Sequence, residues 1–380
     1  MLSRDELAAW LRLASTPGVG RATARRLLKV FGSPERVLAA DARALRALVG
    51  TDAAQALQDG DSHADPRLAA TQRWLDASTG SVPHDIVVLG DPRYPSMLLA
   101  TADPPLLLFT KGRAELLCAP GIAIVGSRRA TPQGLDNARM FARFLSERKL
   151  TIVSGLALGI DGAAHEGGLD GSGSTVAFVG TGLDRVYPAR HAALTQRIAE
   201  QGLVASEYPL GTEPLSHNFP RRNRLIAGIA HGTLVVEAAV ESGSLITARM
   251  AADCGREVFA IPGSIHSPQS RGCHRLIQEG AKLVETGADV LDELSVGVGR
   301  ARLSAAQPSL FATVEPEDIA EDPPCDPLRA ALGHDPVTFD TLAARSGLPS
   351  EELAARLLDL ELAGTVQRLP GGLLQSRSVA

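Results

Sequence analysis

Apolar and polar positions alternate with a helical period over the first 80 residues. Stretches 5–15, 17–32 and 34–50 each carry an apolar stripe with the spacing of an amphipathic helix, and 70–79 adds another. Glycine-containing turns separate the stretches. The pattern predicts an all-helical unit over residues 1–80, of helix–hairpin–helix (SAM-like) type.

Short apolar or β-branched runs then alternate with segments of helical length. The runs are 86–90, 122–126, 151–155, 175–180, 203–207, 233–238, 257–263 and 282–285. Strands that alternate with helices favour a parallel sheet covered on both faces. We therefore expect an open, doubly wound Rossmann-like domain over residues 82–296, which makes the fold class α/β.

A third region follows a stretch rich in Pro, Ala and acidic residues, 297–327, which we expect to be a flexible linker. The pattern of 328–380 predicts helix–turn–helix, with Ser350 as the N-cap of the second helix, followed by a hairpin around Pro370-Gly371-Gly372. This order is typical of a winged helix.

Composition places the 380-residue chain among ordinary globular proteins, because 44% of its residues are hydrophobic and 21% are charged. No apolar run approaches the roughly 20 residues of a membrane span. The four cysteines form no C-x-x-C pair, which favours reduced thiols in a cytoplasmic protein over disulfides or a metal site.

The net charge of −5 argues against a nucleic-acid partner, but the charge is unevenly distributed. Residues 1–50 hold nine basic and four acidic residues, whereas 301–380 hold six and twelve. Residues 121–300 are balanced. Because local potential attracts phosphate, a neutral central domain can still carry a basic groove.

The segment PGVGRATARRLL (17–28) has the form of a helix–hairpin–helix turn. Its Gly18-x-Gly20 turn would present backbone N–H groups to a phosphate, with Arg21, Arg25 and Arg26 as secondary DNA contacts. The alternative, a structural turn with arginines on a solvated face, stays open.

The loop after the 122–126 strand lies where open α/β sheets bind ligands. It contains two arginines in place of dinucleotide-binding glycines, which suits nucleic-acid phosphates better than a buried pyrophosphate. Its candidate residues are Gly126, Ser127, Arg128, Arg129 and Thr131. A solvated basic turn is the alternative.

The segment 216–224 places an aromatic residue beside three arginines in a chain with only 14 aromatics. An aromatic stacking surface flanked by guanidinium groups is typical of sites for single-stranded nucleic acid. The candidate residues are Ser216, His217, Phe219, Arg221, Arg222, Asn223 and Arg224. The alternative is a core phenylalanine at the start of a solvated helix.

Two further places have polar residues at strand ends. Asp161 and His165 would share a helix face, and we interpret them as a structural pair because no nucleophile elbow or third metal ligand accompanies them. The second place holds Glu237 and the segment Ser242–Ala248, with Ser244 as a candidate helix cap. A small nucleotide could bind there.

Long motifs of the chain resemble the DNA-processing protein A (DprA/Smf) family. They are IAIVGSRRATPQG, SGLALGIDGAAHEGGL, VGTGLDRVYPARHAAL, SEYPLGTEPLSHNFPRRNRLIAG, VVEAAVESGSLITARMAADCGREVFAIPG and GAKLV, all within about 86–290. The helical unit and the winged helix also resemble that family's flanking domains.

The resemblance implies a protein that binds single-stranded DNA without sequence preference and loads the RecA recombinase during natural transformation. It implies a homodimer formed through the Rossmann domain, and no membrane association, enzymatic turnover, cofactor or metal. The family's G-S-R loop corresponds to Gly126-Ser127-Arg128, its aromatic to Phe219 and its R-N-R run to Arg222-Asn223-Arg224. The frequent family lysine is replaced by Ser216, with Arg221 and His217 as substitute cations.

Two other classes stay open. One is an enzyme on a similar fold that hydrolyses nucleoside monophosphates, although the stretch before Glu237 lacks the Gly-Gly pair of its P-G-G-x-G-T-x-x-E motif. The other is a scaffold that binds only protein partners.

Overall fold

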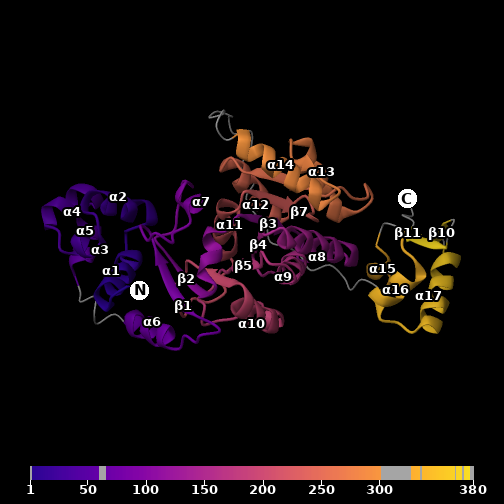
Figure 1. Ribbon diagram of the computed structural model, residues 1–380, viewed down its shortest axis with the longest axis horizontal. Coiled ribbons are helices and arrows are strands. Elements are labelled where there is room, and N and C mark those ends of the chain that lie inside the picture. The colour runs from indigo at the N-terminus through magenta and orange to yellow at the C-terminus, as the bar shows by residue number, and fades with distance from the viewer. Residues whose placement is uncertain are drawn as a thin grey trace.

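The computed structural model describes residues 2–59, 66–300, 327–333, 336–363, 365–369 and 372–376, with backbone alone at 295–300, 327, 329–330 and 369. Figure 1 shows a row of three parts, with the N-terminal helices at one end, the sheet in the middle and a small C-terminal unit at the other end. This is the predicted arrangement of a helical unit, an α/β domain and a winged helix.

The N-terminal unit is helical throughout its described residues. Its helices are α1 (Arg4–Ser15), α2 (Arg21–Phe31), α3 (Pro34–Leu38), α4 (Ala42–Val49), α5 (Thr51–Gln58) and α6 (Pro66–Asp76). The predicted helix 34–50 is divided in two, because the Asp41 side chain accepts hydrogen bonds from the backbone N–H groups of Arg43 and Ala44 and starts α4. Helix α5 was not predicted.

The central domain is built on one nine-stranded sheet in the order β1-β2-β6-β5-β4-β3-β7-β8-β9. The strands are β1 (His84–Val88), β2 (Leu107–Gly112), β3 (Gly121–Val125), β4 (Thr151–Ser154), β5 (Thr175–Phe178), β6 (Leu203–Ser206), β7 (Gly232–Val235), β8 (Glu257–Ala260) and β9 (Lys282–Leu283). Strands β3 to β9 pair in parallel, as predicted.

The expectation of an all-parallel sheet was wrong at one edge. Strand β2 was not predicted, and it pairs antiparallel with both β1 and β6. Its buried run resembles those of the parallel strands, but the expected pattern places a segment of helical length between successive strands. No helix of crossover length joins β1 to β2, because only α7 (Ser96–Leu99) lies between them.

Helices cover both faces of the sheet. They are α8 (Pro132–Glu147), α9 (Ile160–Leu169), α10 (Ala192–Gln201), α11 (Asn218–Ile229), α12 (Gly243–Asp253), α13 (Arg271–Gln278) and α14 (Gly287–Arg300). Helices α8, α9 and α14 bury their apolar side chains in one cluster, whereas α11, α12 and α13 do so in another. Helix α14 runs past residue 296 into the predicted linker, and 301–326 lie outside the described residues.

The direction of winding reverses between two neighbouring strands. From β3 the chain adds β4, β5 and β6 on one side, and from β7 it adds β8 and β9 on the other. In doubly wound sheets, ligands bind beside such a reversal, at the carboxyl ends of the strands. The loops that follow β3 and β7 are therefore where a ligand is expected to bind.

A third hydrophobic cluster joins the N-terminal helices to the sheet. It includes Leu13 and Leu27 of the helical unit together with Phe109 of β2 and Ile198 of α10, all fully or nearly fully buried. The N-terminal unit thus shares a core with one face of the central domain.

The C-terminal unit has the predicted helix–turn–helix and hairpin. Its elements are α15 (Pro327–Leu332), α16 (Phe339–Ser346), α17 (Ser350–Leu362), β10 (Val366–Leu369) and β11 (Leu373–Ser376), around a small core of their own. The prediction of Ser350 as N-cap was wrong, because Pro349 occupies that position and Ser350 is the first helical residue.

Among the described residues, no helix is long and apolar enough to cross a membrane. The described cysteines, Cys118, Cys254 and Cys273, are free thiols, and Cys325 lies outside the described residues.

Candidate nucleic-acid interface

The loop after β3 is drawn tightly against its neighbours. A Cβ atom on Gly126 would lie 2.6 Å from Cγ1 of Ile160 and 2.8 Å from the Glu237 carbonyl oxygen, so only glycine fits there. The Ser127 N–H donates to the Glu237 carbonyl over 2.7 Å, and the Ser127 side chain is buried. This fixed loop holds Arg128 and Arg129 at the surface, where both side chains are exposed.

The Arg128 side chain meets the aromatic residue predicted from the other segment. Its guanidinium carbon lies 5.9 Å from the centroid of the Phe219 ring, within cation–π range. Phe219 belongs to the first turn of α11 and is partly exposed. The structure therefore brings together two residues 91 positions apart, one cationic and one aromatic.

A second aromatic ring completes this surface. Tyr187 lies 5.3 Å from Phe219 between ring centroids, at an interplanar angle of 36°, and is 47% exposed. The sequence reasoning missed Tyr187; the signal was available in the motif VGTGLDRVYPARHAAL, since the chain has only three tyrosines. We call Arg128, Phe219 and Tyr187 the stacking surface.

The backbone just after β5 supports the stacking surface. A Cβ atom on Gly180 would lie 3.1 Å from Cδ1 of Phe219, so the ring rests directly on the backbone there. The Asn218 side-chain amide donates to the Gly180 carbonyl over 3.1 Å and anchors the start of α11. Ser216, His217 and Arg221 are exposed, and Asn223 is half-buried.

Two of the three arginines of the predicted segment, Arg222 and Arg224, point inward. Arg222 is 4% exposed, and its guanidinium donates to the carbonyl oxygens of Gly155 and Phe178. Burial lowers its pKa to about 10, against the attraction of Asp161. This placement argues against a direct phosphate contact by Arg222 and makes it a support for the loop after β4.

Asp161 and His165 support the same loop rather than each other. The Asp161 carboxylate accepts hydrogen bonds from the N–H groups of Gly155 and Ala157. The Leu156 N–H donates to Nε2 of His165, whose Nδ1 lies 2.7 Å from the Thr175 hydroxyl. Burial lowers the pKa of His165 to about 3, so the imidazole is neutral. The interpretation as a structural pair fits these contacts.

The phosphate position of an ordinary Rossmann site is filled by the protein itself. The Glu237 carboxylate accepts hydrogen bonds from the N–H and the hydroxyl of Thr131, the N-cap of α8. A Cβ atom on Gly134 would lie 2.3 Å from Cδ of Glu237, so the carboxylate packs against the first turn of α8. The hydroxyl of Thr131, predicted to contact DNA, is used inside the protein.

Little room is left beside Glu237. The cavity there, lined among others by Thr131, Gln133 and Ser264, has a volume of about 50 Å³. Small-molecule sites typically measure roughly 300–1,000 Å³. Ser244, a predicted helix cap, instead donates its N–H to Ser242, the N-cap of α12.

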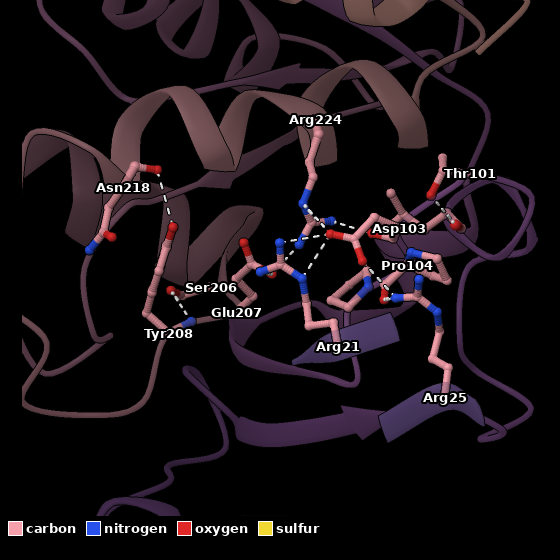
Figure 2. Close-up of polar contacts among 12 residues, drawn as sticks. Arg21, Arg25, Thr101, Asp103, Pro104, Ser206, Glu207, Tyr208, Asn218 and Arg224 are labelled. Atoms are coloured by element: carbon pink, nitrogen blue, oxygen red, sulfur yellow. Dashed lines mark hydrogen bonds and ion pairs between the residues drawn. The ribbon is translucent and has the colours of Figure 1, made fainter. Parts of the chain in front are cut away.

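The arginines of the N-terminal unit lie in a different place (Figure 2). Arg21 and Arg25 form ion pairs with Asp103 at 2.7 and 2.6 Å, and Arg21 also pairs with Glu207 at 3.3 Å. Arg224 of α11 pairs with both carboxylates. We call these five residues the interdomain cluster; Asp103 and Glu207 were not identified from the sequence. Arg26 is exposed and bonds only within its unit in the contacts that the structure describes, to the Leu48 carbonyl.

No group of three or more His, Cys, Asp or Glu side chains is arranged to hold a metal ion in the described part of the chain.

Comparisons with known proteins agree with this architecture. Residues 85–295 match the family model of DNA recombination-mediator protein A, residues 11–59 a SAM-like helix–hairpin–helix tandem and residues 312–372 the DprA winged helix domain. Protein Smf of Escherichia coli is 43% identical over 305 residues, which cover 80% of this chain and 79% of that protein. The DNA processing protein DprA of Streptococcus pneumoniae is 51% identical over 203 residues, covering 53% and 72%.

Two solved structures are similar as well. The X-ray structure of DprA from Streptococcus pneumoniae superposes with a TM-score of 0.66 at 37% identity, covering 77% of this chain and 98% of that one. DNA processing protein A from Helicobacter pylori, whose structure describes a single-stranded DNA binding mode, gives a TM-score of 0.51 at 30% identity, covering 56% and 96%. By these matches, which span all three parts of the molecule, the chain belongs to the DNA-processing protein A (DprA/Smf) family.

Proposed function

We propose that the protein binds single-stranded DNA without sequence preference at the stacking surface, and that it acts by binding rather than by turnover. The observation that carries this proposal is the exposed Arg128 guanidinium over the Phe219 ring, with Tyr187 beside it. Every base has a π-face, so aromatic rings accept bases of any sequence, while an arginine attracts the phosphate backbone. The Helicobacter pylori relative, described as a single-stranded DNA binder, supports it.

We further propose that the protein loads the RecA recombinase on incoming DNA during natural transformation and dimerises through the Rossmann domain. Family membership supports these steps. We also propose domain boundaries at 1–80, 82–296, 297–327 and 328–380, and a cytoplasmic location.

The test is a pair of variants with different signatures. Arg128→Ala removes a phosphate contact, so affinity for single-stranded oligonucleotides should fall for all sequences, and the log–log salt slope should flatten by about 0.7. Phe219→Ala removes stacking, so affinity should fall by on the order of 1–3 kcal/mol with an unchanged slope. Fluorescence anisotropy across a salt series measures both quantities. Wild-type affinity in both folded variants would exclude this site.

The nucleoside monophosphate hydrolase is the second candidate class. The Glu237 carboxylate lies at the N-terminal turn of α8, where a substrate phosphate would bind, and like charges repel there. We expect no release of base from nucleoside monophosphates by wild-type protein. Turnover that disappears in Glu237→Gln would favour the enzyme instead.

A scaffold that binds only proteins is the third class. Binding of a labelled oligonucleotide on a filter, abolished by salt, would exclude it.

A further inference from the structure

We propose that the N-terminal helical unit strengthens single-stranded DNA binding by positioning the first turn of α11, with Arg21 as a positioning residue that does not touch DNA. This inference rests on the proposed function. It assigns a role to the interdomain cluster, and it differs from the sequence-based hypothesis, in which Arg21, Arg25 and Arg26 contact phosphates.

The first step is that the arginines of α2 are turned toward the central domain. Arg21 places its guanidinium between Asp103 and Glu207, and Arg25 bonds Asp103 together with the carbonyls of Pro104 and Ala102 (Figure 2). A guanidinium has five N–H donors in fixed directions, and carboxylates bind them as phosphates do. With these contacts made, the two side chains are not directed at an external phosphate.

The second step is that Glu207 depends on its arginines. Its side chain is 5% exposed and follows the end of β6. Burial raises its pKa, which Arg224 and Arg21 oppose. Both ion pairs use Oε2, so the loss of Arg21 would leave this buried carboxylate with Arg224 as its remaining described ion-pair partner. A buried carboxylate that loses an ion-pair partner is destabilised. We infer that the backbone at Glu207 then shifts to bring the carboxylate toward solvent or another donor.

Glu207 is connected to the stacking surface through its neighbour Tyr208. Tyr208 donates its hydroxyl hydrogen to the Asn218 carbonyl over 3.2 Å, as Figure 2 shows. Asn218 precedes Phe219 and begins α11. No side chain caps this helix start, and its Asn218 is held by the bond from Tyr208 and by the bond from its own amide to the Gly180 carbonyl. A shift of Glu207 therefore shifts Tyr208, and with it the orientation of the Phe219 ring.

The experiment uses the full-length protein and an oligonucleotide containing 2-aminopurine, whose fluorescence reports base stacking. For Arg21→Ala we expect affinity to fall on the order of 2- to 30-fold, the range of coupling through packed networks. We also expect a weaker stacking signal and an unchanged salt slope. A phosphate contact would instead flatten the slope by about 0.7. Arg43→Ala removes the same charge from an exposed position of the same unit and should behave as wild type.

Two further variants protect the test against misfolding. Tyr208→Phe removes only the hydroxyl and should lower the stacking signal with Arg21 intact. Arg21→Lys keeps a cation beside Glu207 and should recover part of the affinity. A flattened slope in Arg21→Ala, or wild-type affinity and stacking in both Arg21→Ala and Tyr208→Phe, would overturn the inference. If wild-type protein itself fails to bind single-stranded DNA, the proposed function fails instead.

Discussion

Gly180, in the loop after β5, determines how closely the Phe219 ring approaches the backbone there. A Cβ atom there would lie 3.1 Å from the ring, closer than an ordinary van der Waals contact. Gly180→Ala should therefore displace the ring and weaken single-strand binding, by at most the roughly 1–3 kcal/mol of one stacked base. Anisotropy titration measures the loss. The control is Gly80→Ala, at an exposed position with no atom within 4 Å of the added carbon, which should bind as wild type.

His165 makes the stability of the fold depend on pH. Burial lowers its folded-state pKa to about 3, from an ordinary value of 6.5. The unfolded chain therefore takes up the proton first, so this group lowers stability as the pH falls below 6.5 and stops doing so near 3. From pH 7 to pH 5 the contribution is about 2 kcal/mol.

Urea unfolding at the two pH values tests this. His165→Asn keeps one donor and one acceptor for Thr175 and Leu156 but does not titrate. Its stability should change less between pH 7 and pH 5 than that of the wild type. Equal pH dependence in both proteins would mean that other groups dominate.

At the scale of elements, α17 occupies the position of a recognition helix but exposes an acidic face. Glu351, Glu352 and Asp359 are exposed on it, while Arg356 pairs with Glu352 and Arg368 of β10 pairs with Glu361. Because phosphate attraction dominates DNA affinity, this face suits a protein partner better than a duplex.

Removal of the winged helix should therefore leave single-strand binding intact. Its core forms a hydrophobic cluster of its own, so a chain that ends at residue 300 keeps the clusters of the other two parts. We expect the full chain and the shortened chain to bind single-stranded DNA with affinities within about twofold of each other in the same salt. A twofold difference corresponds to about 0.4 kcal/mol. A loss of tenfold or more would assign DNA contacts to the winged helix.

At the scale of the whole molecule, the N-terminal helices and the sheet should unfold together, because one hydrophobic cluster spans both. Leu27→Ala in α2 and Phe109→Leu in β2 each remove buried apolar atoms, and the leucine truncation costs about 2–5 kcal/mol. Calorimetry should show both variants shifting the same transition. A separate transition of the winged helix should not move. Shifts of different transitions would show that the shared core does not couple the two parts.

Periodicity determined most elements, because each parallel strand is a short apolar run bounded by helical segments. Strand β2 was missed because no helix of crossover length separates it from β1. The boundary between α3 and α4 was missed because it depends on the Asp41 cap. Such features depend on neighbours or on one side chain rather than on a period.

The three parts of the molecule, the family and the pairing of a cation with an aromatic ring at strand ends could be predicted from the residues alone. Which arginines face solvent depends on how the chain packs. Along α11, successive residues turn by about 100°, so neighbouring positions face different surroundings. Phe219 meets Arg128, Arg222 is buried under the loop after β4, and Arg224 joins the interdomain cluster.

The sequence alone presents Arg21 and Arg25 as cations without partners. In the folded chain they bond Asp103 and Glu207, which lie more than 75 residues away in the sequence. The sequence shows where each charged side chain stands along the chain. The partner of that side chain depends on how distant elements pack together.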